Sequence, residues 1–304
     1  MSNNFVEASG WKQLSFNTGE FVLIDGHALA FRHYFALPPE KFTTQRGEIT
    51  NAIYGFARNI MDILKTSPTY VAVVFDRGLS GRDKLYPKYK GNRPKGGNTL
   101  AIQIDRIKEL LKAFHIPVIE RKGIEGDDVI GSIARKIVRN GTRVRIVTCD
   151  HDLIQLVDQD ISVELPTGVY TLDKARKDYG LEPRQIPDLK GLMGDKTDNI
   201  PGVKGIGLKI ATRLLQEYGT LENLYDHLDR LKPRIRKLLA TSREIAFLSK
   251  CLCQIKNNLR FTVKLEQCVP YRWSVDEVRR LLSQLEFRTL LPKLPQLAVT
   301  LRAV

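Results

Sequence analysis

Acidic residues gather at three places along this chain, each next to an apolar stretch. Residues 125–128 read Glu-Gly-Asp-Asp, 150–152 read Asp-His-Asp, and 195–198 read Asp-Lys-Thr-Asp. Carboxylates this close repel one another, so a fold that collects them needs positive charge among them. Hard oxygen ligands suit Mg²⁺ or Mn²⁺ better than zinc. The spacing therefore predicts a divalent-metal site.

The elements that must position these acids are short buried strands. Strands are predicted by the apolar runs at 21–24, 70–75 and 144–148. Asp25 and Asp76 directly follow the first two runs, and Asp150 follows the third. An amphipathic helix at 49–64 separates the first two strands, which implies a parallel crossover. Carboxyl ends of parallel strands meet at one edge of a sheet, so these acids have a geometric reason to converge.

An all-oxygen site of this kind could hold two ions about 4 Å apart, which activate a water and stabilise the leaving oxygen in phosphodiester cleavage. Any single Asp could equally be a helix cap or a surface charge, but so many together exceed what capping requires. The predicted metal ligands are Asp25, Asp76, Glu125, Asp127, Asp128, Asp150, Asp152, Asp195 and Asp198. His27 and His151 sit beside acids but are interpreted as packing or hydrogen-bonding residues, because a metal-bound hydroxide needs no histidine base.

Composition supports a polyanionic partner. The 304 residues carry a net charge of +14, with a pI near 9.6, and the excess Lys and Arg lie apart from the acidic clusters. The four cysteines form no CxxC pair and are interpreted as free thiols. No apolar run reaches transmembrane length and residues 1–20 lack a signal-peptide layout, so we expect a cytoplasmic protein. Residues 1–20 and 295–304 are predicted to be an extension and a tail.

Residues 77–99 form a basic, glycine-rich stretch with Tyr86 and Tyr89 as its main large side chains. It is interpreted as a segment that grips phosphates and offers rings for base stacking, or alternatively as a solvated loop. From residue 187 the pattern becomes helical, with a glycine-rich turn that could aim N–H groups at a phosphate. A hairpin is predicted at 161–172 and an edge strand at 263–265. The chain thus divides into 21–186 and 187–294.

Taken together, these motifs resemble the 5′ nuclease family, which includes the nuclease domain of bacterial DNA polymerase I, phage 5′ exonucleases and flap endonucleases. The resemblance covers residues 21–294. The matching segments are Asp25-Gly26-His27 with Arg32, Phe75-Asp76, Tyr86 to Arg93, Glu125 to Asp128, Asp150 to Asp152, and Gly194 to Gly207. The chain ends near residue 304, so it is expected to be a free-standing nuclease or an excised domain. The family usually places an aromatic residue before Arg82 and a His after it, where this chain has Gly81 and Asp83.

The resemblance implies an α/β fold with a PIN-like, mostly parallel sheet between helices, and a helix-three-turn-helix motif at 187–220. It implies a first metal site from Asp25, Asp76, Glu125, Asp127 and Asp128, and a second from Asp150, Asp152, Asp195 and Asp198. By the same resemblance, residues 77–99 form an arch through which a single-stranded 5′ flap passes. Lys90, Arg93 and Arg32 become contacts to the reacting phosphate. The implied DNA contacts are Arg82, Tyr86, Tyr89, Gly202, Val203, Lys204, Gly205, Ile206, Gly207 and Lys209.

The function this implies is a Mg²⁺-dependent 5′→3′ exonuclease and flap endonuclease, with Mn²⁺ as a substitute and K⁺ at the helix-three-turn-helix turn. Its substrates would be DNA with a 5′ flap, nick or 5′ end, and RNA–DNA hybrids, in primer removal or repair. We expect a monomer with no membrane partner. Two alternatives remain open: a module that binds branched DNA but cuts it poorly, and a PIN-type ribonuclease, which the long turn-rich second half disfavours.

Overall fold

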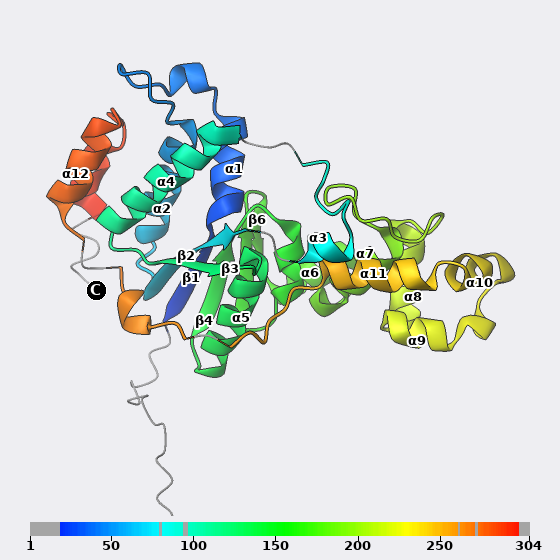
Figure 1. Ribbon diagram of the computed structural model, residues 1–304. Helices are drawn as coiled ribbons and strands as arrows, with labels where there is room; N and C mark the ends of the chain where they lie inside the picture. Colours follow the sequence, from blue (N-terminus) through cyan, green and yellow to red (C-terminus); the bar gives the residue numbers. More distant parts are fainter. Residues whose placement is uncertain (1–18, 79–80, 94–96, 261, 271–272, 298–304) are drawn as a thin grey trace, which may run out of the picture.

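The computed structural model describes residues 19–78, 81–93, 97–260, 262–270 and 273–297, so most of the predicted extension and tail lies outside the described residues. Its centre is a six-stranded sheet with strand order β3-β2-β1-β4-β5-β6 (Figure 1). The strands are β1 (Glu20–Asp25), β2 (Tyr70–Arg77), β3 (Val118–Lys122), β4 (Arg143–Val147), β5 (Ile161–Leu165) and β6 (Gly168–Tyr170). The first five are parallel, and β6 pairs antiparallel with β5 as the predicted hairpin. The predicted mostly parallel α/β fold is confirmed.

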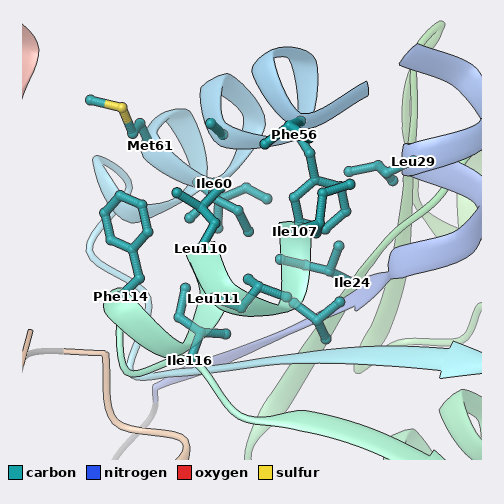
Figure 2. Packing of buried hydrophobic residues seen from close by; sticks show 14 of the residues in the cluster. Ile24, Leu29, Phe56, Ile60, Met61, Ile107, Leu110, Leu111, Phe114 and Ile116 are labelled. Carbon is teal, nitrogen blue, oxygen red and sulfur yellow. The ribbon is translucent and has the colours of Figure 1, made fainter. Parts of the chain in front are cut away.

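Alternation along the strands sends side chains to two cores, one on each face of the sheet. Val22 and Ile24 of β1 enter the first core, while Phe21 and Leu23 enter the second. Helices α1, α2, α4 and α12 cover the first face, and α5 covers the second (Figure 1). Figure 2 shows the first core, where side chains of α2 and α4 meet those of β1 and α1. The helices are α1 (Gly26–Ala36), α2 (Asn51–Leu64), α4 (Gly97–Ala113), α5 (Gly126–Arg139) and α12 (Val275–Gln284).

Five further helices build a second lobe beside the sheet, drawn in green, yellow and orange on one side of Figure 1. It has its own core, which includes Leu189, Leu192, Leu214 and Leu224. Its helices are α7 (Ile186–Met193), α8 (Leu208–Tyr218), α9 (Leu221–Asp226), α10 (Pro233–Ala240) and α11 (Arg243–Cys253). Helix α6 (Leu172–Tyr179) follows β6 and buries Ala175 in the second core. The short α3 (Arg82–Leu85) lies on the path from β2 to α4. The 3₁₀ turns are η1 (Pro39–Lys41), η2 (His151–Leu156), η3 (Pro183–Gln185), η4 (Leu228–Arg230), η5 (Leu265–Gln267) and η6 (Leu291–Lys293).

One expectation about the C-terminal part is corrected. The segment at 263–265 is not a strand, because Val263 packs into the second core and the chain then forms η5. Helix α12, from the predicted C-terminal region, buries Val278 and Leu282 in the first core beside α4. Over the described ranges, no helix combines the length and apolar character needed to cross a membrane.

Candidate metal and nucleic-acid site

Four of the predicted ligands lie along the carboxyl edge of the sheet. Asp25 ends β1, where it accepts hydrogen bonds from the Ala28 N–H (3.0 Å) and from Thr148 Oγ1 (2.8 Å). Asp76 near the end of β2 accepts a bond from the Gly126 N–H, which draws the first turn of α5 to the same edge. Asp127 follows on that turn, and Asp150 lies just beyond β4. The strand ends therefore lie at one edge of the sheet, as predicted.

The carboxylates at this edge act on one another electrostatically. Burial, reinforced by the charges of Asp76 and Asp150, raises the pKa of Asp25 to about 7. Burial and the charges of Asp150 and Asp25 likewise raise the pKa of Asp127 well above its usual range. Such repulsion is what a bound cation relieves. His27 Nδ1 accepts the Asp76 N–H at 2.9 Å, so this histidine is a hydrogen-bonding residue as predicted.

The donor set fits a hard divalent ion because every acid offers oxygen. Within the described residues, however, no three acidic, His or Cys side chains stand close enough together to hold an ion as they are placed. The fit therefore rests on the chemistry of the donors and on their mutual repulsion.

Basic side chains from the predicted arch reach these acids. Lys90 Nζ lies 3.0 Å from Glu125 Oε2. Burial alone would lower the pKa of Lys90, but nearby negative charge, chiefly that of Glu125, raises it. Arg93 donates from Nε to Asp198 Oδ1 at 3.0 Å and also lies 3.8 Å from Asp150. Two of the three residues predicted to contact a reacting phosphate, Lys90 and Arg93, are thus held at the edge of the carboxylate cluster.

The acids assigned to the second metal site are joined by a lysine that the sequence analysis did not identify. Lys190 of α7 forms ion pairs with Asp152 and with Asp195 Oδ2, the latter at 2.5 Å. Burial alone would raise the pKa of Asp195, but Lys190 and backbone N–H donors lower it. The signal in the sequence is a lysine within the mostly apolar α7, five residues before Asp195.

Arg82, a predicted DNA contact, and Asp128, a predicted metal ligand, form a buried ion pair. The Arg82 guanidinium lies 2.8 and 3.1 Å from the two Asp128 oxygens and 3.1 Å from Glu125 Oε1, and it donates to the Gln254 carbonyl at 2.8 Å. The Lys256 N–H also donates to Asp128 Oδ1 at 2.8 Å. Arg82 is therefore buried within the protein, and these donors contact both Asp128 oxygens.

The other predicted DNA contacts differ in exposure. Tyr86 and Tyr89 are half-buried and pack against an apolar cluster that includes Ile200 and Leu252, and the Tyr89 hydroxyl lies 3.4 Å from Glu125. Arg32 is exposed on α1, where it lines a cavity of about 330 Å³ that also borders Thr148 and Cys149.

The glycine-rich turn before α8 is compact. Gly202 has φ +60, and a Cβ there would lie 2.2 Å from the Gly194 nitrogen, so only glycine fits. Val203 and Ile206 bury their side chains in the second lobe, which leaves only their backbone for a ligand. Lys204 and Lys209 are exposed, as are Gly205 and Gly207, and could face a phosphate.

Comparison with known proteins gives matches over nearly the whole chain. A model described as "5'-3' exonuclease, N-terminal resolvase-like domain" matches residues 20–180, and "5'-3' exonuclease, C-terminal SAM fold" matches 181–276. The "5'-3' exonuclease" of Aquifex aeolicus is 37% identical over 279 residues, covering 90% of this chain and 95% of that protein. DNA polymerase I of Caldicellulosiruptor bescii is 41% identical over 285 residues, which cover 90% of this chain but only 33% of the polymerase. The chain thus spans about a third of the length of the polymerase relatives it matches.

The fold is also shared with a solved structure. The D15 flap endonuclease of bacteriophage T5, described as a complex with DNA and metal ions, has a TM-score of 0.62. Its sequence is 22% identical, and the match covers 92% of this chain and 99% of that one.

Proposed function

The chain belongs to the 5′-3′ exonuclease family, and we propose on this basis that it is a structure-specific 5′→3′ exonuclease and 5′-flap endonuclease acting on DNA. One observation carries the proposal: Asp25, Asp76, Asp127 and Asp150 converge at one sheet edge, where their mutual repulsion favours a bound cation. A phosphodiester is the substrate that such a site, flanked by Lys90 and Arg93, suits best.

In this function, Asp25, Asp76, Glu125 and Asp127 would hold one divalent ion, and Asp150, Asp152, Asp195 and Asp198 would hold a second. Asp128, paired with Arg82, would hold the first turn of α5 in place beside them. Magnesium is the expected ion and Mn²⁺ can replace it, because both prefer oxygen ligands. When bound, the ions supply an activated water and stabilise the leaving oxygen.

The chain's own side chains place and neutralise the substrate. Lys90 and Arg93 exchange their carboxylate partners for the scissile phosphate, whose charge they offset. Arg32, exposed on α1 near Cys149, contacts the phosphate from the other side. The turn at 202–207, with Lys204 and Lys209, binds the backbone of the duplex, and its carbonyls hold a K⁺ ion.

The proposed substrates are DNA with a 5′ flap, a nick or a free 5′ end, and RNA–DNA hybrids, in primer removal or repair. We propose that the protein acts as a monomer, with 21–186 as the nuclease part, including an arch at 77–99, and 187–294 as the DNA-binding part. The packing of α12 on the nuclease core modifies this division at its C-terminal end.

The test is a gel assay on a duplex with a labelled 5′ flap. We expect cleavage near the flap junction with Mg²⁺ and none with EDTA. Binding of the flap without Mg²⁺-dependent cleavage would overturn the nuclease assignment in favour of a branched-DNA-binding module.

A further inference from the structure

Helix α5 connects the carboxylate cluster to a separate basic groove. The groove has a volume of about 600 Å³ and lies between the outer face of α5 and the crossing segment, residues 254–260, which follows α11. Its lining includes four basic residues, Arg135, Lys136, Arg139 and Arg260, and no acidic one. None of these four is assigned a role in the proposed cleavage.

The crossing segment is fixed to α5 by hydrogen bonds. The Lys256 N–H donates to Asp128, and Ser132 Oγ donates to the Lys256 carbonyl at 3.2 Å. The Leu259 N–H donates back to Ser132 Oγ at 3.1 Å. Ser132 is itself buried, so this wall of the groove is built into the fold.

Two of the groove's guanidinium groups are available to a ligand. Arg135 is already paired with Asp158. Arg139 and Arg260 are exposed, and no carboxylate among the described residues pairs with either. Asn257 and Asn258 add neutral donors along the same wall. Free guanidinium groups beside amide donors are the chemistry that binds a phosphodiester backbone without reading its sequence.

The distance from the site suits a strand that continues past the reaction. Asp127 lies in the first turn of α5 and Arg139 at its end, twelve residues later. At ~1.5 Å per residue this is about 18 Å. A stacked single strand with ~3.4 Å per nucleotide covers that length in about five nucleotides.

We propose that the groove binds the phosphates of the single-stranded 5′ arm, beginning about five nucleotides from the scissile bond. This proposal rests on the flap-cleaving function above and extends it, since it assigns α5 the task of holding the strand that will be released. Affinity for the substrate then depends on flap length.

The test compares the pair Arg139→Ala/Arg260→Ala with the control pair Arg143→Ala/Lys264→Ala. Each control residue is exposed and lies four positions after one of the two groove residues, and neither lines the groove. Replacing the control pair with Ala removes the same charge as replacing the groove pair. Binding to duplexes with flaps of about 2 or about 15 nucleotides, on either side of the five-nucleotide reach, is measured by fluorescence anisotropy, with Ca²⁺ replacing Mg²⁺. Cleavage by the wild type with Mg²⁺ is scored in parallel.

We expect the groove pair to weaken binding of the long flap by about threefold to tenfold, and to reduce its salt slope by about 1.4, or ~0.7 for each lost phosphate contact. Binding of the short flap should match the wild type, and the control pair should change neither. The groove proposal alone is overturned in either of two cases while the wild type cuts flaps. In the first, the groove pair and the control pair have the same binding affinities; in the second, the groove pair loses the same affinity for the short and the long flap. A wild type that neither binds nor cuts flaps overturns the proposed function, and the groove assignment with it.

Discussion

Arg82 and Asp128 lie face to face, with the guanidinium 2.8 and 3.1 Å from the two carboxylate oxygens. The pair joins α3, which follows β2, to the first turn of α5, and Arg82 also reaches the Gln254 carbonyl. One buried cation thus connects three segments that are distant in sequence.

We expect Arg82→Ala to lower the free energy of unfolding by about 3–5 kcal/mol, because it leaves the buried Asp128 carboxylate without its partner. Lys84→Ala in the same helix is the control, since Lys84 is exposed and should change stability by less than about 0.5 kcal/mol. Urea denaturation of both variants measures the difference. Equal midpoints would contradict a stabilising role for the pair.

Asp25→Asn should abolish cleavage yet stabilise the metal-free protein at high pH. The pKa of Asp25 is raised in the folded state to about 7, mainly by burial, so the folded protein holds this proton more tightly than the unfolded chain. Ionisation of Asp25 therefore costs stability as the pH rises through about 7, and this cost is absent below about 4.

The measurement is the Tm in EDTA at several pH values. We expect the Asn variant to melt about 2–4 °C higher than the wild type at pH 8, with the gap closing toward pH 4. A constant gap over this range would exclude Asp25 ionisation as its source.

Asp150→Asn should remove cleavage while leaving flap binding within about twofold. Asp150 adds negative charge to the cluster, and among the described residues its ion pair is the 3.8 Å contact with Arg93. Gel cleavage with Mg²⁺ and anisotropy with Ca²⁺ separate the two effects. Wild-type cleavage by this variant would remove Asp150 from the ligands.

Lys204→Ala should weaken duplex binding and reduce the slope of log K against log salt by about 0.9, which corresponds to one phosphate of a double helix. Lys204 is exposed on the turn before α8. Titrations at four salt concentrations provide the slope, and an unchanged value would place Lys204 outside the interface.

Gly202→Ala should destabilise the protein and impair duplex binding, because its Cβ would lie 2.2 Å from the Gly194 nitrogen and the residue has a positive φ. Gly207→Ala is the matched control, since nothing lies within 4 Å of a Cβ there and φ is −99. Thermal melting of both variants is the readout. Similar Tm values would show that the turn relaxes around the added methyl group.

Much of the fold could be predicted because local patterns determine it. The apolar runs before Asp25 and Asp76 predict the strands. Parallel pairing then places the carboxyl ends of the strands at one edge of the sheet, independently of the rest of the fold. The contacts of Arg82 and Lys190 could not be predicted, because their partners are set by packing between distant segments. The packing of Tyr86 and Tyr89 could not be predicted for the same reason, because the apolar surface that they contact comes from the second lobe.

The packing of α12 has a consequence for how the chain can be divided. Its side chains close the core between the sheet and α4, although more than a hundred residues of the other lobe separate them from the last strand. A fragment that ended at residue 186 would expose that core to water. Residues 275–284 thus contribute part of the first core, so a partly synthesised chain lacks that part until the helices of the second lobe have also been made.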